Sequence, residues 1–378
     1  MKIAIIGCGA AGSIMARVFA DSGHEVDVFE KRSHIAGNCY DEYDQHGVLI
    51  HKYGPHYFRT DSEILLEYLS RFARWRSASY HVQAMIDGEL VPLPISLSTL
   101  TTLTGRVFNE QELALYLQNA RVGIGTSVEG QFEPKNAEEQ CLVRFGTEIY
   151  QKFFLHYTAK QWGILPKDLS PSVTARIPLR YNFDQRYPEE KYQVLPSDGL
   201  TAMFKRMLFH PKIQVKINTI VGSEEIAALK LKYSLIFYTG PIDQYFNCVY
   251  GQLSYRSLYF EWKNFSFPYL WPCVQINYPN EHPYTRCVEI KHATGQLISS
   301  TTVCYEHPVR YCQDSTTEPY YPMLTQDNLQ LLERYNVMVD EESVGSTPVH
   351  FVGRLAEYRY YNMDQILLKA YNLANMLV

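Results

Sequence analysis

The first thirty residues show two hydrophobic patterns in succession. Residues 2–6 are a short aliphatic run, which is typical of a strand buried on both faces of a parallel sheet. Apolar residues then recur at positions 14, 15, 18 and 19 with helical spacing, and Ser22-Gly23 is a stop signal for a helix. Residues 26–30 form a second strand-like run that ends in an acid. The pattern predicts a strand, a helix and a second, parallel strand.

The segment between the predicted strand and helix is rich in glycine and reads G-C-G-A-A-G. Gly7 would make the tight turn, and Gly9 would let a pyrophosphate approach the backbone. Gly12 would let the helix pack closely on the strand, and the helix N-terminus would offer N–H groups and a positive dipole to phosphates. Glu30, eighteen residues after Gly12, is placed to bind a ribose hydroxyl pair. In this context the segment, Ala11 included, predicts a dinucleotide-binding unit.

The residues after the acid resemble a segment of FAD proteins of the glutathione-reductase structural class. From Glu30 the chain reads E-K-R-S-H-I-A-G-N, where such proteins have an E-K-R-x-x-x-G-G pattern. The resemblance implies that four residues approach the adenosine and pyrophosphate of FAD: Lys31, Arg32, Gly37 and Asn38. Ala36 stands where many relatives carry the first glycine, which is a small change.

Further along the chain, strand and helix patterns occupy longer blocks. Alternating apolar residues predict strands within 76–97. From residue 96 to about 154 the pattern is helical, interrupted by a polar connection at 123–136. Residues 246–325 are rich in Tyr, Val and Thr and predict antiparallel strands. Residues 349–355 predict a strand that meets a glycine turn.

Composition and charge narrow the function classes. The 378 residues are 46% hydrophobic and 20% charged, which excludes wholesale disorder. Lys plus Arg is 35 and Asp plus Glu is 40, so the net charge of −5 argues against a general nucleic-acid or anionic-membrane binder. Eight cysteines occur without a C-x-x-C pair, so we expect reduced thiols in a cytoplasmic protein and no metal site. The sequence has no run of 18 apolar residues, so we expect no insertion into a membrane.

Three segments combine aromatic rings with cations or histidine. Residues 51–60 read H-K-Y-G-P-H-Y-F-R-T, and the Gly54-Pro55 turn puts His56 on a loop, where we favour a functional role over core packing. Residues 153–163 are unusually rich in rings, and residues 176–187 alternate cations with aromatics. Since aromatics stack on bases and arginine binds phosphates bidentately, these segments fit a nucleotide carried on a small molecule. Single-stranded nucleic acid would also fit, but the net charge argues against it.

Taken together, the motifs resemble those of the bacterial UDP-galactopyranose mutase family, over residues 3 to about 370. The most specific are Y-T-A-K-Q-W-G at 157–163 and G-R-L-A-E-Y-R-Y at 353–360. Others are H-K-Y-G-P-H-Y-F, R-I-P-L-R-Y-N-F-D, Y-T-G-P-I-D-Q-Y-F, P-Y-T-R and P-Y-Y-P. The resemblance implies an isomerase that uses FAD and interconverts the pyranose and furanose rings of a UDP-sugar without net redox change.

The resemblance also implies a mechanism and partners. Reduced FAD would use N5 as a nucleophile on the anomeric carbon and displace UDP, and an iminium would let the sugar ring open and reclose. An external reductant such as NAD(P)H would first reduce the flavin. Family members of this size are often homodimers, and the furanose product feeds the synthesis of surface polysaccharides.

Residue by residue, the family implies roles for the positions that match its motifs. Arg176 and Arg286 would clamp the diphosphate, and His56 would lie beside the flavin. The further substrate contacts would be Phe153, Phe154, Tyr157, Thr158, Trp162, Tyr187, Tyr321 and Tyr360. Among these, Tyr157 would stack on uracil. The glycine turn and the start of the last helix would place five residues at the flavin: Gly353, Arg354, Asn362, Met363 and Asp364.

Three departures from the family pattern leave the sugar open. Arg59 stands where most members have histidine, Tyr80 where relatives usually have Asn, and Asn362 where many have Asp. Arginine at position 59 occurs in relatives that also accept the N-acetylated sugar, and it could donate to an acetamido carbonyl or shift the diphosphate. The substrate is therefore UDP-galactose, UDP-N-acetylgalactosamine or a dTDP deoxy sugar such as fucose; neutral drift at a tolerant pocket would also explain these changes.

Two functions from other classes stay open beside the mutase. A flavin oxidase or dehydrogenase of the same structural class would not need the diphosphate-binding arginines and tyrosines. A non-catalytic UDP-sugar-binding relative would not need the flavin fingerprint or His56.

The expected architecture is α/β with three domains. A Rossmann-like FAD-binding domain would be assembled from the discontinuous segments 1–75, 200–245 and 340–378. A helical domain would span 98–170, and an antiparallel β-sheet domain would comprise 76–97, 171–199 and 246–339.

Overall fold

In the computed structural model, the N-terminal pattern folds as predicted. Strand β1 (Lys2–Ile6) leads into helix α1 (Ala10–Asp21), and strand β2 (Glu25–Phe29) follows. The two strands are parallel, with Ile5 opposite Val28. Glu30 is the first residue after β2, so the acid lies at the carboxyl end of that strand.

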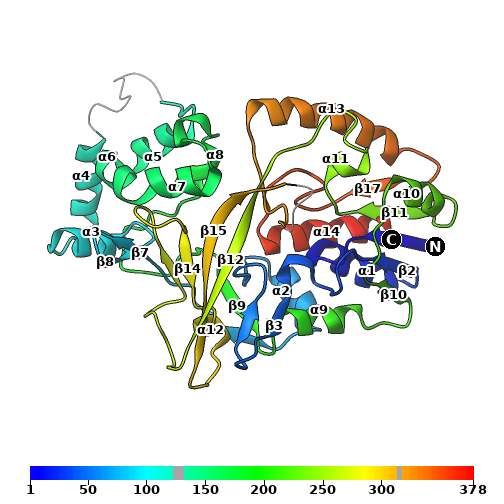
Figure 1. Cartoon of the computed structure of the whole chain (residues 1–378), viewed down its shortest axis with the longest axis horizontal. Coiled ribbons are helices and arrows are strands. Elements are labelled where there is room, and N and C mark those ends of the chain that lie inside the picture. Colours follow the sequence, from blue (N-terminus) through cyan, green and yellow to red (C-terminus); the bar gives the residue numbers. More distant parts are fainter. Residues whose placement is uncertain (122–131, 313–316) are drawn as a thin grey trace. The chain divides into compact units, whose positions relative to one another are not determined.

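The structure describes residues 1–121, 132–312 and 317–378, so residues 123–131 of the predicted polar connection lie outside the described part. The chain divides into two units, each made of separate segments (Figure 1). The first unit consists of Met1–Ala78, Glu190–Tyr255 and Gln326–Val378. The second consists of Ser79–Glu189 and Arg256–Thr325.

A five-stranded parallel sheet forms the centre of the first unit. Its order is β10 (Ile213–Lys216), β2, β1, β11 (Leu235–Tyr238) and β17 (Val349–Phe351). All four neighbouring pairs are parallel. Consecutive strands are separated by long connections, as parallel pairing requires.

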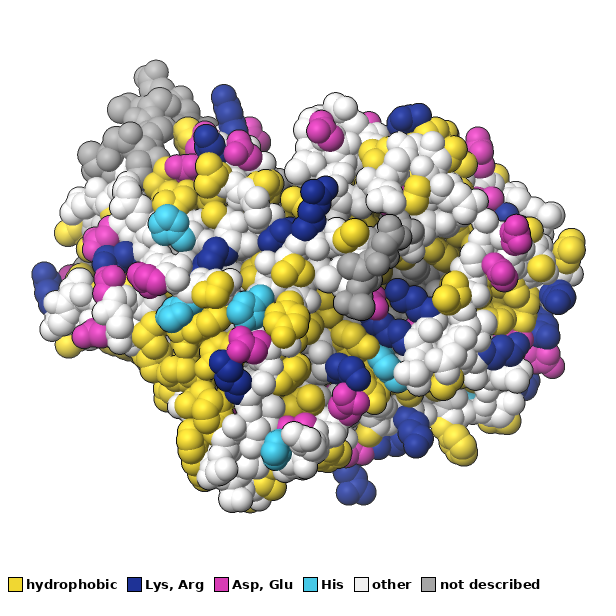
Figure 2. Space-filling model, in the orientation of Figure 1, with side chains coloured by type: hydrophobic (Ala, Val, Ile, Leu, Met, Phe, Trp, Pro, Cys, Tyr) yellow, Lys and Arg dark blue, Asp and Glu magenta, His cyan; other side chains and the backbone are white. Residues whose placement is uncertain are grey.

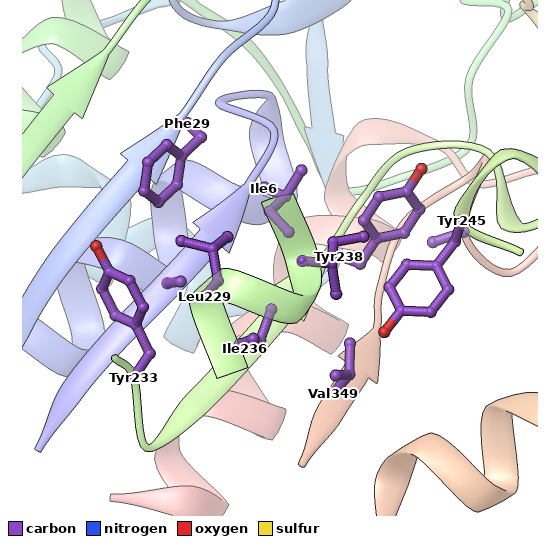
Figure 3. Close-up of a cluster of buried hydrophobic side chains, with 11 residues drawn as sticks. Ile6, Phe29, Leu229, Tyr233, Ile236, Tyr238, Tyr245 and Val349 are labelled. Atoms are coloured by element: carbon purple, nitrogen blue, oxygen red, sulfur yellow. The ribbon is translucent and has the colours of Figure 1, made fainter. Parts of the chain in front are cut away.

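Both faces of this sheet are covered, which explains the continuous aliphatic runs. On one face, Ile6 and Ile236 pack with Leu229 of α10 (Ser223–Lys230) and Tyr245 of α11 (Ile242–Tyr245) (Figure 3). On the other face, Phe237 meets Phe19 of α1 with ring centroids 5.3 Å apart. Helix α14 (Met363–Leu377) packs beside α1 (Figure 1).

The remaining elements of the first unit surround this sheet. They include the hairpin of β3 (Asp41–Tyr43) and β4 (Leu49–His51), and the sheet of β5 (Phe58–Thr60), β9 (Tyr192–Pro196) and β6 (Trp75–Ser77). The helices are α2 (Glu63–Ser70), α9 (Leu200–Leu208) and α13 (Gln326–Ser343).

A seven-stranded sheet forms the centre of the second unit. Its order is β16 (Tyr321–Pro322), β12 (Tyr255–Phe265), β15 (Thr301–Arg310), β14 (Arg286–Val288), β13 (Gln275–Asn277), β7 (Val82–Ile86) and β8 (Glu89–Leu93). The pairs β12–β15, β15–β14, β14–β13 and β7–β8 are antiparallel, whereas β13 and β7 are parallel. The prediction of antiparallel strands is confirmed for these four pairs and is wrong for the junction of β13 and β7.

The helical block of the second unit is also confirmed. It comprises α3 (Leu97–Thr104), α4 (Glu110–Ala120), α5 (Ala137–Phe145), α6 (Thr147–Ile149), the π-helix η2 (Tyr150–Leu155), α7 (His156–Trp162), η3 (Pro166–Asp168) and α8 (Ser172–Ala175). A short helix, α12 (Lys291–Thr294), lies after β14. The π-helix is notable because such segments occur frequently at functional sites.

The two-unit division differs from the domain prediction at several boundaries. Residues 76–78, 190–199, 246–255 and 326–339 were expected in the sheet domain but belong to the first unit. Of these, residues 326–339 are helical in α13. Helix α13 packs on β17, a contact between distant segments that no local pattern reveals. The separation of a helical domain at 98–170 stays a prediction.

Other expectations concern thiols and the surface. All eight cysteines are free thiols. In the described part of the chain, no helix is both long and apolar enough to cross a membrane. Figure 2 shows basic and acidic side chains interspersed over one face of the molecule.

The glycines of the first turn differ in how much space surrounds them. A Cβ on Gly12 would lie 2.0 Å from the carbonyl oxygen of Gly7, so helix α1 packs on the strand only without a side chain there. Gly9 has φ −77° and ψ −165°, and its Cβ would lie no closer than 3.9 Å to Gly37. The fold therefore requires glycine at position 12 but tolerates alanine at position 9.

Gly12→Ala is expected to lower the free energy of unfolding by about 1–3 kcal/mol, because the new methyl group overlaps backbone atoms. The matched variant Gly9→Ala is expected to stay within about 0.5 kcal/mol of wild type. Urea unfolding of proteins freed of any bound ligand, followed by circular dichroism, measures both. Equal stability of the two variants would contradict this packing.

Candidate functional site

The second unit contains a buried ion pair between neighbouring strands. Arg286 begins β14 and lies directly opposite Glu306 of β15. The Arg286 Nε donates to Glu306 Oε2 at 2.6 Å, and Nη2 donates to the Tyr321 hydroxyl at 3.4 Å. Glu306 is fully buried, whereas one fifth of the Arg286 side chain is exposed. The carboxylate thus holds the guanidinium at the edge of the core with part of it facing outward.

The electrostatics of this pair favour a charged arginine. Burial opposes the charge on Arg286, but Glu306 outweighs it and holds the pKa of the guanidinium well above its usual value. Burial raises the pKa of Glu306, and Arg286 opposes that rise. Within the described part of the chain, Arg286 Nη1 and Glu306 Oε1 have no hydrogen-bond partner. The pair is therefore able to accept a further polar group, such as an anion at Nη1.

Several predicted substrate tyrosines gather around Arg286. The guanidinium charge acts on the phenols of Tyr321, Tyr157 and Tyr80. Burial raises the pKa of Tyr157 to about 12, although Arg286 opposes this shift. Tyr80 is buried, its hydroxyl donates to Gln275 Oε1 at 2.8 Å, and its carbonyl accepts from the Tyr187 N–H at 2.8 Å. The structure thus brings Tyr157, Tyr321, Tyr80 and Tyr187 close to Arg286, and their role in substrate binding stays a prediction.

The ring-rich segment folds as one continuous helical stretch. Phe153 and Phe154 are buried in η2, and Thr158 and Trp162 are buried in α7. The Trp162 ring lies 6.2 Å from the ring of Tyr321. This places Trp162 beside the tyrosine cluster, while the two phenylalanines pack with Phe145 as core.

Arg176 lies at the end of a short, exposed segment. It caps α8, its side chain is exposed, and its Nε donates to the Val173 carbonyl at 3.3 Å. Arg144 of α5 donates to the carbonyls of Thr174, Ala175 and Ile177 at 3.2, 2.9 and 2.6 Å. The backbone around Arg176 is thereby tied to α5. The clamping role of Arg176 stays a prediction.

In the first unit, the predicted cofactor segments form a glycine-lined turn. Gly7 has φ +104°, and a Cβ there would lie 1.9 Å from Thr239 Oγ1. A Cβ on Gly37 would lie 2.9 Å from the Cα of Gly9. The two loops can approach this closely only because position 37 has no side chain. Backbone N–H groups are therefore accessible to a close ligand, as a dinucleotide requires.

The acid after β2 organises the neighbouring loop. Glu30 is buried, and its carboxylate accepts from the N–H groups of Cys8 and Arg32 at 2.8 and 2.9 Å. Arg32 Nη2 donates to Asn38 Oδ1 at 2.9 Å, and Lys31 is exposed. These contacts bring Glu30, Arg32 and Asn38 to one place beside the glycine turn.

Ala36 occupies a conformation that usually favours glycine. Its φ is +72°, in the left-handed region, and the residue is fully buried. This explains why many relatives carry glycine here. The chain keeps the turn with alanine at a local cost of roughly 1–2 kcal/mol.

The loop that carries His56 is fixed by buried polar groups. The His56 N–H donates to His51 Nδ1 at 3.0 Å, which requires an unprotonated nitrogen. Burial lowers the pKa of His51 to about 4, so this acceptor is present at neutral pH. His51 Nε2 lies 4.0 Å from Asp41, whose carboxylate accepts from the Leu200 N–H at the start of α9. The position of His56 therefore depends on α9 through two buried side chains.

Arg59 forms a salt bridge with Glu190, a residue that the sequence analysis did not identify as functional. Its Nη1 donates to both carboxylate oxygens of Glu190, at 2.9 and 3.0 Å. The charges of Tyr57, Glu190 and Tyr360 outweigh burial and raise the pKa of Arg59. Within the described part of the chain, its Nε and Nη2 have no hydrogen-bond partner. Arg59 is thus oriented, with two nitrogens left to donate.

The C-terminal turn and helix lie close to this arginine. Gly353 has φ +131°, and Arg354 Nη2 donates to the Tyr361 carbonyl, with its guanidinium 5.0 Å from the Tyr360 ring. Asn362 caps α14 and Met363 begins it, as predicted. Burial raises the pKa of Asp364, and Arg59 opposes that shift. Asp364 Oδ1 is buried with no partner among the described residues.

Three residues of these sites escaped the sequence reasoning: Glu306, Glu190 and Tyr57. Glu306 and Glu190 each lie more than 19 positions from the arginine that they bind, so no local pattern connects them. A signal existed for Glu306 alone, since it directly follows the apolar residues 303–305 and a charged residue is unusual in a buried strand.

Two family models match parts of the chain that contain these residues. The family model for UDP-galactopyranose mutase matches residues 152–360, which include Tyr157, Arg286 and Glu306. The model for an NAD(P)-binding Rossmann-like domain matches residues 5–72, which contain the glycine turn. The two models thus cover the two candidate sites.

Relatives match over nearly the whole length. A probable UDP-galactopyranose mutase of Klebsiella pneumoniae is 34% identical over 99% of this chain and 94% of the relative. A dTDP-fucopyranose mutase of Escherichia coli is 33% identical over 100% of this chain and 98% of the relative. A solved structure of reduced UDP-galactopyranose mutase has the same fold, with a TM-score of 0.78 at 16% identity, over 100% of this chain and 95% of that one. The chain therefore belongs to the UDP-galactopyranose mutase family.

Proposed function

We propose that this chain is a flavin-dependent mutase that interconverts UDP-galactopyranose and UDP-galactofuranose. One observation carries the proposal: the fully buried Glu306 orients Arg286 beside Tyr157 and Tyr321. This arrangement suits a diphosphate with an attached base, because guanidinium groups bind phosphate oxygens and aromatic rings stack on bases. A flavin oxidase acting on a redox substrate would not need it.

The glycine turn of the first unit fits FAD. Gly7, Gly9 and Gly37 give a backbone surface that side chains would fill, and Glu30 lies beside it at the end of β2. The chemistry that reduced flavin supplies when bound is a nucleophilic N5 for the anomeric carbon, with no net change in oxidation state. An external reductant such as NAD(P)H would therefore be needed before turnover. The cofactor contacts predicted for Arg354, Asp364 and His56 belong to this proposal.

The chain's own residues would act mainly on the leaving group. Arg286 would bind the diphosphate and stabilise the charge that develops when the bond to the anomeric carbon breaks. Glu306 would keep the guanidinium in place so that little reorganisation is needed. Tyr157 would stack on uracil, Tyr187, Tyr321 and Tyr360 would donate to phosphate oxygens, and Arg176 would add a second positive charge.

Two observations keep other sugars as candidates. The E. coli dTDP-fucopyranose mutase is nearly as similar as the Klebsiella relative, at 33% against 34% identity. Arg59 also has two nitrogens that could donate to an N-acetyl carbonyl while Glu190 holds the third. UDP-N-acetylgalactopyranose and dTDP-fucopyranose are therefore the alternative substrates.

A conversion assay tests the proposed function. The purified protein would be examined for a flavin spectrum, reduced with dithionite, and incubated separately with UDP-galactofuranose, UDP-N-acetylgalactofuranose and dTDP-fucofuranose, with chromatographic detection. Conversion of UDP-galactofuranose to its pyranose only after reduction is the expected result. Bound flavin without conversion of any of the three sugars would reject the assignment as a mutase. Conversion of only UDP-N-acetylgalactofuranose or only dTDP-fucofuranose would identify that sugar as the substrate in place of UDP-galactose.

Gly9→Ala tests the cofactor part of the proposal. The new methyl group fits the protein itself but occupies the space where a pyrophosphate would approach the backbone. The dissociation constant for FAD, measured by titration of the flavin-free protein, is expected to rise at least about tenfold, a cost of about 1.4 kcal/mol. Unchanged FAD affinity in a folded Gly9→Ala protein would contradict this site.

Glu306→Gln tests the diphosphate part. The amide keeps the shape of the side chain but removes the charge that faces Arg286, and breaking a buried pair costs about 2–5 kcal/mol. The dissociation constant for UDP is expected to rise at least about tenfold by calorimetry. The matched control Glu261→Gln changes an exposed carboxylate of β12 and should leave UDP binding unchanged. Unaltered UDP affinity in Glu306→Gln would remove this residue from the site.

Arg59→His tests the choice of sugar. A shorter side chain cannot keep the Glu190 contact and reach an acetamido carbonyl. The rate with UDP-N-acetylgalactofuranose relative to that with UDP-galactofuranose is expected to fall about tenfold, the worth of one hydrogen bond. Arg71→His, at an exposed position of the same unit, serves as control. An unchanged rate ratio would mean that Arg59 has a structural role only and does not determine the choice of sugar.

A further inference from the structure

Lys160, in the middle of the most specific family motif, has an unusual set of partners. Its Nζ donates to four backbone carbonyls of one turn, those of Tyr278, Asn280, His282 and Tyr284, at 2.6, 3.2, 2.8 and 3.3 Å. This turn connects β13 to β14. Burial lowers the pKa of Lys160 to about 8, so the group is still mostly an ammonium at pH 7.

Two further contacts tie the same elements together. Thr285 Oγ1 donates to Gln161 Oε1 at 3.1 Å, directly after the turn. Arg256 of β12 donates to the carbonyls of Lys160 and Gln161, at 3.2 and 3.0 Å, where α7 ends. Gly163 follows with φ +72°, and a Cβ there would lie 2.9 Å from Arg256 Nη1. The C-terminal end of α7 is therefore fixed against β12 and the β13–β14 turn.

These two elements carry the two ends of the proposed UDP site. Tyr157 lies one turn before Lys160 on α7, and Arg286 lies at the first position of β14, directly after the turn. In UDP the base and the diphosphate are joined covalently, so both protein groups bind the same molecule only if their spacing is right. Preorganised spacing increases affinity because the second contact then forms at high effective concentration.

We propose that Lys160 is a positioning residue for the nucleotide: its ammonium group holds the β13–β14 turn on α7 and so fixes the spacing between Tyr157 and Arg286. Lys160 itself needs no contact with the substrate. The inference rests on the proposed function, since it assumes that Tyr157 and Arg286 bind the two ends of UDP. It assigns the lysine of the Y-T-A-K-Q-W-G motif a role separate from those of its tyrosine and tryptophan.

The test compares UDP with its two halves. Dissociation constants for UDP, uridine and pyrophosphate would be measured by calorimetry, with displacement of UDP for the weak ligands, on wild type, Lys160→Met and Lys167→Met. Lys167 is an exposed lysine of η3 in the same unit and is the matched control. In Lys160→Met the constant for UDP is expected to rise about tenfold. Those for uridine and pyrophosphate should change less than about twofold, because each half uses only one element.

Thr285→Val provides a second variant that keeps the shape of the side chain. It removes the Gln161 contact between the same two elements, together with a longer bond of 3.4 Å to the Glu306 carbonyl, whose main partner, the Thr285 N–H, is kept. UDP affinity is expected to fall about threefold with the same selectivity. This variant decides the question if Lys160→Met does not fold. Loss of affinity for UDP alone supports the proposal in either variant.

Three outcomes would overturn the inference. UDP affinity unchanged in both variants would show that the spacing does not depend on this tie. Equal losses for UDP, uridine and pyrophosphate would indicate general damage to the unit instead of altered spacing. Failure of wild type to bind UDP would reject the UDP-sugar assignment and this inference with it. If wild type binds UDP, the variants test the inference about Lys160 separately from the proposed function.

Discussion

A positive charge held within the protein by a buried carboxylate is the constraint on which the second unit depends. Arg286 and Glu306 pair across β14 and β15, and the desolvation of both groups is offset only while the pair stays intact. The register of the two strands is therefore tied to the electrostatics of the site. An anion that binds to the outward nitrogens of Arg286 meets a charge that is already oriented, which is how preorganised sites stabilise developing charge.

In the proposed function the two units would bind phosphates by different means. The first unit would use backbone N–H groups at a turn where Gly7, Gly12 and Gly37 leave no room for side chains. The second would use the side chains of Arg286 and the tyrosines around it. Backbone groups suit a cofactor that stays bound, because they lose no conformational freedom on binding. Arginine suits a substrate whose bond to the diphosphate must break, since its charge adapts to the leaving group.

Sequence reasoning predicted the first site better than the second for a physical reason. The elements of the Rossmann turn are contiguous, so the strand, glycines, helix and Glu30 could all be read from residues 2–30. The second site joins α7, β14 and β15. Arg286 was identified because its motif matches the family, whereas its partner Glu306 was not identified. Glu306 and Lys160 reach their partners through strand register and through a turn, and neither contact leaves a periodic signal in the sequence. Likewise, the helix at 326–343 belongs to the first unit because of packing on β17, which no local pattern reveals.

A crystal structure of the protein with UDP is the most direct test of the central claim, that the Arg286–Glu306 pair is the diphosphate site of a nucleotide-sugar mutase. The account predicts a phosphate oxygen within hydrogen-bonding distance of Arg286 Nη1, with Nε still donating to Glu306 and uracil stacked on Tyr157. A diphosphate bound elsewhere, or a guanidinium that leaves Glu306 to reach it, would contradict the account.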